Sequence, residues 1–316
     1  MSRARFILNL LAGVLGALLC AGAGAQEAAP SLATAREQQA LAQAVAALKA
    51  SFVTPLDSAR LSAPTVRGLL QEVDPEMGVY FDEAEVKAFS TRAIAPPSAP
   101  APASLSSSRS ADGALILRIT AFTQGTLADA VERLSQEWKQ QPFPGLVLDL
   151  RGSPGGLVTT ATCLATLFLP ADAVVARSAG RSAEANQVYR ASAADLRRDL
   201  PAGALAALPA AARKTPLVVL VGEKTAAGAE LLTAALQDHR RATIVGRTTL
   251  GRSSIQTDMP VANGGAIKFT VAWWLSPSGQ SLHRRGVTPD VVVDRPDEAL
   301  ELAQALQALG QATALK

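Results

Sequence analysis

The residues best placed to do chemistry lie between Pro216 and Gln256, where the chain reads PLVVLVGEKTAAGAELLTAALQDHRRATIVGRTTLGRSSIQ. The apolar run 217–221 predicts a buried strand, and the spacing of apolar residues over 229–238 predicts a helix. A helix N-terminus presents free N–H groups and a partial positive charge, which stabilise an anionic intermediate. A nucleophile at the turn between this strand and this helix would therefore suit acyl transfer.

A glycine-rich turn lies in a second segment, Gly145 to Pro170, which reads GLVLDLRGSPGGLVTTATCLATLFLP. A predicted strand over 146–150 runs into the turn 151–156, and an apolar helix follows. Taken alone, such a unit would also fit a phosphate loop. The chain carries neither G-x-G-x-x-G nor a Walker pattern, so nucleotide binding is disfavoured.

Together the two segments resemble the C-terminal processing (tail-specific) serine peptidase family. That family carries a turn like S-A-S-A-S-E, then Q-D-x-x-R-A-x-x-V-G-x-x-T-x-G-K-x-x-x-Q, and a glycine turn D-L-R-x-N-P-G-G. The residues that match these motifs without a gap are Glu230, Gln237, Asp238, Arg241, Ala242, Val245, Gly246, Thr249, Gly251 and Gln256, with Asp149, Arg151, Pro154, Gly155 and Gly156. Further matches, nearer the two ends of the chain, are Asp74, Pro75, Tyr80, Glu83, Phe89, Pro277, Ser278, Gly279, Gly286, Pro289 and Asp290.

The resemblance places the family's nucleophilic Ser on Ala227 and its Lys base on Arg252. Ala has no hydroxyl, and Arg stays charged and offers only donors, so this pair cannot work as a Ser-Lys dyad. The resemblance also implies that Gly155 and Gly156 belong to a loop that helps form the oxyanion hole, and that Gln256 belongs to the site. We therefore expect a catalytically inactive relative.

The alternative is a misplaced alignment, in which Thr225 or Ser253 is the nucleophile of an active serine-type endopeptidase. Ser153 replaces the family's Asn in the glycine turn. If Arg252 points into the site and a carboxylate such as Glu230 binds it, a salt bridge fills the former active site.

The resemblance implies an α/β fold, with a tail-specific-protease (crotonase-like) core over 111–295 and an N-terminal helical segment over 26–90. The Pro/Ala/Ser-rich stretch 91–110 is expected to be a linker, because it cannot bury a core. In the family a PDZ domain usually stands there, so the chain resembles a member without one. A closing helix is expected over 296–316, and the Ala-rich insert 193–214 is expected to be a solvated surface helix or a lid.

A targeting signal is expected over 1–25. Arg3 and Arg5 precede an apolar run, and Ala23-Gly24-Ala25 fits a cleavage site after Ala25. These features predict a periplasmic or secreted protein with no membrane span after cleavage. After cleavage Cys163 is the remaining cysteine, so an internal disulfide is excluded and core packing is expected.

Charge and aromatic content bear on whether the protein binds nucleic acid. Without the two leader arginines the chain has 28 basic and 27 acidic residues, and aromatic residues are 4% of the sequence. Nucleic-acid binding is therefore disfavoured. Neither His239 nor His283 has the further partners that a Ser-His-Asp triad needs. We expect no cofactor and no metal.

These features lead to one functional expectation. The chain is expected to bind a peptide or unfolded protein segment, or to regulate an active protease in the cell envelope, as a homo- or hetero-oligomer. A purely structural envelope protein that keeps the fold as a scaffold is a third interpretation.

Overall fold

The structure is a computed structural model that describes residues 32–57, 61–94 and 104–314. The expected leader over 1–25, with its cleavage site after Ala25, lies outside the described residues. Within them, no helix combines the length and apolar character needed to cross a bilayer.

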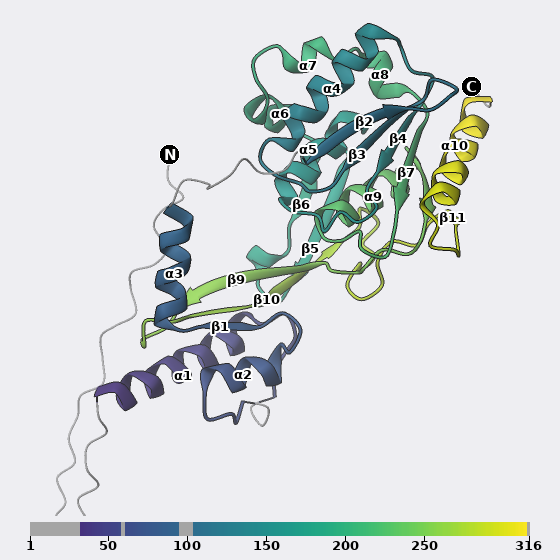
Figure 1. Cartoon of the computed structure of the whole chain (residues 1–316). Helices are drawn as coiled ribbons and strands as arrows, with labels where there is room; N and C mark the ends of the chain where they lie inside the picture. Colours follow the sequence, from purple (N-terminus) through teal and green to yellow (C-terminus); the bar gives the residue numbers. More distant parts are fainter. Residues whose placement is uncertain (1–31, 58–60, 95–103, 315–316) are drawn as a thin grey trace, which may run out of the picture.

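A six-stranded sheet forms the centre of the molecule (Figure 1). Its strand order is β11-β8-β7-β4-β3-β2, and every neighbouring pair is parallel except β2 with β3. The strands are β2 (Leu105–Arg109), β3 (Leu115–Ile119), β4 (Leu146–Asp149), β7 (Leu217–Val221), β8 (Thr243–Gly246) and β11 (Val291–Val292).

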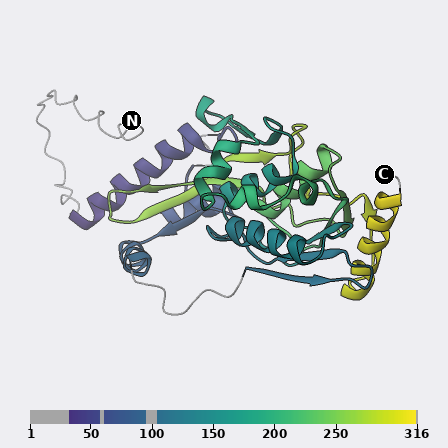
Figure 2. The same cartoon turned by 90° about the horizontal axis from the view of Figure 1, so that it is seen from above.

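Helices cover both faces of this sheet. The parallel strands β3, β4, β7 and β8 are added in one direction, and right-handed crossovers then place the connecting helices on one face. Those helices are α4 (Thr126–Gln140), α5 (Val158–Phe168) and α9 (Gly228–Asp238). The C-terminal helix α10 (Glu298–Ala314) packs on the other face, against β4, β7 and β8 (Figure 2).

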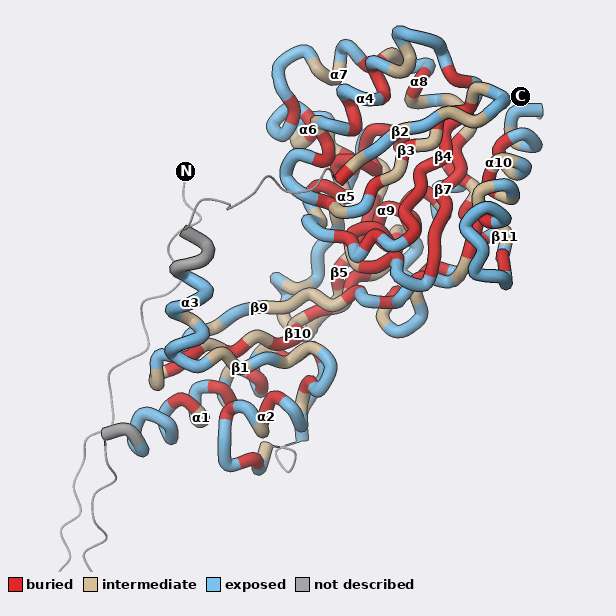
Figure 3. Tube along the Cα trace, in the orientation of Figure 1, coloured by how far each residue is buried: buried red, intermediate tan, exposed pale blue. Residues whose placement is uncertain are grey.

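Alternating side chains along the strands supply two cores. Leu146 and Leu148 of β4 belong to the core under α4, α5 and α9, whereas Val147 belongs to the core under α10. Because successive side chains of a strand point to opposite faces, one continuous apolar run fills both cores. Figure 3 shows β4, β7 and α9 as a largely buried block.

A second sheet, which is antiparallel, joins this core to the N-terminal segment. Its order is β1-β10-β5-β6, and β9 pairs with β10. The long ribbon of β9 (Ser254–Pro260) and β10 (Ala266–Leu275) reaches from the core to the N-terminal helices (Figure 1). The other strands are β1 (Val79–Phe81), β5 (Val174–Gly180) and β6 (Val188–Arg190), and a 3-10 helix (Ala183–Ala185) connects the last two.

The N-terminal segment contains α1 (Leu32–Ser51), α2 (Val66–Val73) and α3 (Glu83–Ile94). Ala40, Ala44 and Leu48 of α1 are buried against α2 and the β9–β10 ribbon. Helix α1 is therefore part of this packed segment.

Two of the expected boundaries differ from the structure. Helix α3 continues to Ile94, and Leu105–Arg109 forms strand β2, so the expected linker 91–110 is too long at both ends. The run LSSSR has little strand propensity of its own, and pairing with β3 determines its conformation.

The insert 193–214 forms three short helices instead of a solvated helix. These are α6 (Ala193–Asp199), α7 (Ala204–Ala207) and α8 (Ala210–Lys214). They bury Leu196, Leu200, Leu208 and Ala212 in the core beside α4 and α5. Because these side chains are part of the core, the insert covers that core.

Candidate active site

Ala227 lies at the turn between β7 and α9 in a strained backbone conformation. Its φ is 50° and its ψ is −119°, and it is the N-cap of α9. Residues other than Gly rarely adopt a positive φ, and such strain costs about 1–3 kcal/mol. A sharp, strained strand-to-helix turn is the geometry that exposes a nucleophile in other hydrolases. Here the same geometry presents a methyl group.

Glu230 ties this turn to the loop that contains Arg252. Its Oε2 accepts hydrogen bonds from the N–H of Ala227 at 2.9 Å and from the N–H of Arg252 at 3.0 Å. Its Oε1 accepts from Thr249 Oγ1 at 2.5 Å and from Gly251 N at 2.6 Å. The backbone N–H groups of Ala227 and Arg252, the two expected dyad positions, therefore bind the same carboxylate oxygen.

The Glu230 side chain is fully buried, and this burial raises its pKa, while the four donated hydrogen bonds lower it. All four partners donate, since Thr249 Oγ1 also accepts a hydrogen bond from Val287 N at 2.7 Å and so directs its proton to Glu230. A protonated Glu230 would have no acceptor for its own proton in this arrangement. The hydrogen-bond pattern therefore fits the ionised carboxylate.

The guanidinium of Arg252 does not form the salt bridge considered from the sequence. Glu230 binds the backbone of Arg252, and the side chain of Arg252 is exposed without an ion pair to any described residue. Three backbone N–H groups and the Thr249 hydroxyl already occupy both oxygens of Glu230. The guanidinium is left at the surface.

Gly155 and Gly156 pack directly on the turn. Gly155 has φ 85°, and a Cβ there would lie 2.4 Å from Ala226 O and 2.7 Å from Gly228 N. A Cβ on Gly156 would lie 2.1 Å from Phe122 O. The glycine turn can approach the N-terminus of α9 this closely only without side chains.

Two backbone donors at this junction are unused. Among the described residues, no acceptor lies in hydrogen-bonding geometry with the N–H of Gly156 or Gly228. The neighbouring N–H groups are used, since Ala226 N donates to Ser153 O and Leu157 N donates to Phe122 O. A pair of free N–H groups beside a helix N-terminus can bind an anionic or carbonyl oxygen.

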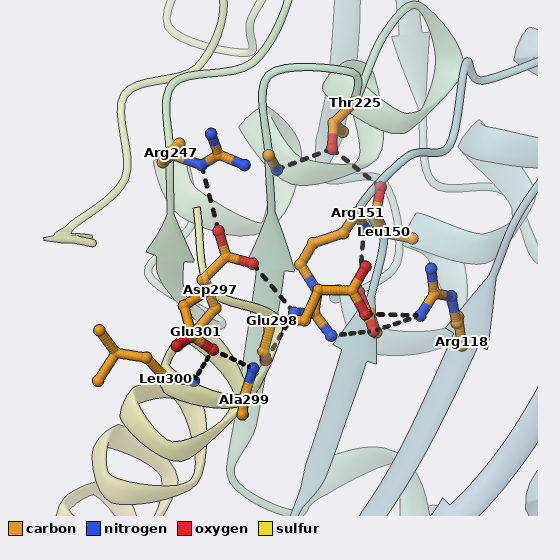
Figure 4. A network of polar contacts seen from close by, with 12 residues as sticks. Arg118, Leu150, Arg151, Thr225, Arg247, Asp297, Glu298, Ala299, Leu300 and Glu301 are labelled. Atoms are coloured by element: carbon orange, nitrogen blue, oxygen red, sulfur yellow. Dashed lines mark hydrogen bonds and ion pairs between the residues drawn. The ribbon is translucent and has the colours of Figure 1, made fainter. Parts of the chain in front are cut away.

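The hydroxyl of Thr225 is fully engaged and buried. It donates to Leu150 O at 2.9 Å and accepts from Gly222 N at 3.0 Å, and the residue is 0% exposed (Figure 4). Its proton therefore lies on a backbone carbonyl and not on a base.

Ser253 is also buried, with 1% exposure, and its Oγ has no hydrogen-bond partner among the described residues. The hydroxyl of Ser153, which replaces the family's Asn, is likewise buried without a partner. None of these hydroxyls forms a hydrogen bond to a described side chain that could act as a base.

Gln256 points away from any base. Its Nε2 donates to the carbonyl of Met77 at 2.7 Å, which links β9 to the turn after α2. Beside it, Arg284 pairs with Glu76, and this ion pair lowers the pKa of Glu76. In this structure Gln256 holds the N-terminal segment against the core.

The two histidines lie apart from these hydroxyls. His239 caps α9 at its C-terminal end, and its Nε2 lies 2.7 Å from Val174 O. His283 is half-buried, and its ring stacks on Trp273 with centroids 3.7 Å apart. Neither ring contacts Thr225 or Ser253.

A buried ionic network supports the glycine turn from behind (Figure 4). Arg151 pairs with Asp149 at 2.8 Å and with Glu301 of α10 at 3.0 Å, and Glu301 also accepts from Arg247 Nε at 3.1 Å. Burial opposes the charge of Arg151, but hydrogen bonds to Asp149 and Glu301 raise its pKa above the usual value.

Sequence reasoning missed Glu301 and Arg247. The available signal was weak, because Glu301 is one of two carboxylates in the first turn of the closing helix, and only its place on the apolar face distinguishes it from Glu298. Such a residue needs a buried cation when its helix face is covered.

The model of Peptidase family S41 matches residues 113–293. The Carboxy-terminal-processing protease of Bartonella bacilliformis is 35% identical over 183 residues, which are 57% of this chain and 38% of that protein. The Carboxyl-terminal-processing protease of Synechocystis is 33% identical over 197 residues, 62% of this chain and 42% of that protein. The chain thus spans about two fifths of the length of these curated relatives.

Two solved structures share the fold over most of the chain. A photosystem II D1 C-terminal processing protease superposes with a TM-score of 0.64 at 18% identity, covering 87% of this chain and 97% of that one. A lipoprotein from Streptococcus agalactiae gives a TM-score of 0.61 at 14% identity, with coverages of 91% and 99%. At these identities the likeness concerns the fold alone, and it confirms the expected α/β core with an N-terminal helical segment.

Proposed function

The chain belongs to peptidase family S41, and from this premise we propose that it is a member without peptidase activity that binds an extended peptide or unfolded segment at the former active site. The observation that carries the proposal is the nature of the two residues whose backbone N–H groups Glu230 binds, Ala227 and Arg252. A methyl group stands at the strained turn and an exposed guanidinium stands beside it. Neither can attack a carbonyl or accept a proton.

Peptide binding is supported by what remains around Ala227. The free N–H groups of Gly156 and Gly228 can receive a peptide carbonyl oxygen. Leu157 and Leu250 adjoin the same junction and are 48% and 50% exposed. Exposed apolar side chains next to unused donors form the mixed surface that a peptide backbone and its side chains require.

We place this activity in the periplasm or outside the cell, on the strength of the leader sequence. An active protease that presents its own unfolded segment would be a partner of the same kind. In that case the protein would regulate the protease by binding to it, in a hetero-oligomer.

The first experiment tests for catalysis. Purified protein is expected to leave an unfolded substrate uncleaved, and Ala227→Ser with Arg252→Lys is expected to restore slow cleavage. Each single replacement is the control, since one half of a dyad is insufficient. Wild-type proteolysis that Thr225→Ala or Ser253→Ala abolishes, or labelling of the wild type by a serine-reactive probe, would overturn the proposal in favour of a shifted nucleophile.

The second experiment tests for binding, by fluorescence anisotropy with a labelled, apolar, unfolded peptide. Leu250→Asp is expected to weaken binding about tenfold, because it places a charge on the proposed surface. Leu300→Asp is the matched control, since Leu300 is 37% exposed on α10, which covers the opposite face of the sheet from α9. Equal affinities for the two variants would contradict binding at this site.

A further inference from the structure

An open pocket of about 1000 Å³ lies at the edge of the main sheet where strands β7 and β8 begin. Pro216, Leu217, Ala242 and Thr243 at the starts of these strands line it. The candidate active site follows the C-terminal ends of β4 and β7. The two sites therefore lie at opposite ends of the parallel strands. Residues of α8 and of the end of α10 line the pocket, and both elements lie at this end of the molecule (Figure 1).

One wall of the pocket is apolar. It consists of residues 167–170 at the end of α5, together with Leu217, Ala242 and Ala312. The arginine Arg241 stacks its guanidinium over the ring of Phe168 at 5.8 Å and donates to the carbonyls of Arg213 and Thr215. Arg241 therefore holds α8 in place and is part of the frame of the pocket.

The rim of the pocket is strongly cationic. Arg213, Lys214, Arg240 and Arg241 line it, and Asp290 is the one carboxylate among the described residues that line the pocket. Both oxygens of Asp290 are already hydrogen-bonded, to Gln237 Nε2 at 2.9 Å and to Ile244 N at 2.8 Å.

None of the three arginines forms an ion pair within the described part of the chain. Helices α5 and α9 end here, and each helix end carries a partial charge of about −0.5, which offsets only part of this positive charge.

Arg213 offers unpaired donors to the pocket. Its Nε is buried without an acceptor, whereas its terminal amino groups are not buried and have no hydrogen-bond or ion-pair partner among the described residues. An oxygen anion in the pocket would bind these terminal groups in a charge-assisted hydrogen bond. The unpaired guanidinium, the cationic rim and the apolar wall therefore favour one class of ligand, an anion with an apolar group.

We propose that this pocket binds a small organic anion, in which a carboxylate or phosphate group pairs with Arg213 and Arg240 and an attached apolar group lies on the wall formed by residues 167–170. The site is separate from the proposed peptide site, and it does not depend on the state of Ala227 or Arg252.

The test is calorimetric titration of the full chain with four probes. Hexanoate and hexyl phosphate carry both features, hexanamide lacks the charge, and inorganic phosphate lacks the apolar group. Hexanoate or hexyl phosphate is expected to bind at least tenfold more tightly than either incomplete probe. Whichever of the two binds more tightly identifies the head group. Equal binding of hexanamide, or binding of inorganic phosphate as tight as that of hexyl phosphate, would overturn the proposal.

Variants localise the binding. Arg213→Gln is expected to weaken it by about 10-fold or more, the range for a hydrogen bond to a charged group, and Arg240→Gln by about two- to threefold. The matched control is Arg197→Gln on α6, which removes the same charge from an exposed position outside the pocket and should leave affinity unchanged. Arg240 is exposed, so its variant stays folded and keeps the test valid if Arg213→Gln does not fold. Equal affinities for Arg240→Gln and Arg197→Gln, or no binding by any probe, would contradict the assignment.

Discussion

At the scale of the residue, Ala227 keeps a backbone conformation that its side chain does not require. With φ at 50° and ψ at −119°, it lies in a region that Gly enters freely and other residues do not. We predict that Ala227→Gly raises the free energy of unfolding by about 1 kcal/mol, because relief of strain exceeds the added entropy of the unfolded chain.

Chemical denaturation of the two proteins measures this difference. Ala229→Gly is the control. Ala229 is a buried residue of α9, and replacing a helical Ala by Gly should lower the free energy of unfolding of the protein. If Ala227→Gly were destabilising as well, the turn would not be strained.

The glycine turn allows a second prediction at this scale. Gly152 and Gly155 both have positive φ, at 72° and 85°, but only Gly155 has backbone atoms within reach of a Cβ. Gly152→Ala should cost about 1–2 kcal/mol for its left-handed conformation alone. Gly155→Ala should cost clearly more, since Ala226 O and Gly228 N would both have to move. Thermal unfolding of the pair measures the excess, and equal melting temperatures would refute the close packing.

At the scale of the element, α10 is held to the sheet by charge as well as by apolar contact. The side chain of Glu301 is 2% exposed and pairs with Arg151 and Arg247. Glu301→Gln leaves two partly buried cations short of a counter-charge, so we predict a loss of about 3 kcal/mol in the free energy of unfolding.

Urea titration checks this prediction. Glu298→Gln removes a carboxylate from the same turn of α10, but its side chain is 76% exposed, so it should cost less than about 1 kcal/mol. Equal effects of the two replacements would mean that the buried network contributes no more than a surface charge.

Some elements of the fold could be predicted from the sequence, and others could not. The strands over 115–119 and 217–221 and the helix α9 follow from apolar periodicity, because each buries a continuous or regularly spaced face. The strand Leu105–Arg109 does not follow from its residues, since its partner β3 determines it. The resemblance to the peptidase family placed Ala227 and Arg252 in one site, but it did not predict that Glu230 binds both through their backbones, because that depends on how two loops meet.

At the scale of the whole molecule, the N-terminal segment is joined to the core around one half-buried histidine. His283 stacks on Trp273, close to the contacts of Gln256 with Met77 and of Arg284 with Glu76. Burial and the charge of Arg284 lower the pKa of His283 below its usual value of 6.5. Its Nδ1 is buried without a partner among the described residues, so a protonated ring would bury an unpaired donor.

The lowered pKa makes stability depend on pH in a defined direction. As the pH falls through 6.5, the unfolded chain takes up the proton before the folded chain does, so the free energy of unfolding decreases until the lowered pKa of the folded state is passed. We predict that His283→Gln makes the decline of the free energy of unfolding between pH 7 and pH 5 less steep. The change in slope corresponds to at most one proton fewer taken up on unfolding. Denaturation at several pH values measures this slope, and an NMR titration of the His283 ring measures its pKa. A ring that titrates at or above pH 6.5 in the folded protein would contradict both the burial of the imidazole and the coupling of pH to this junction.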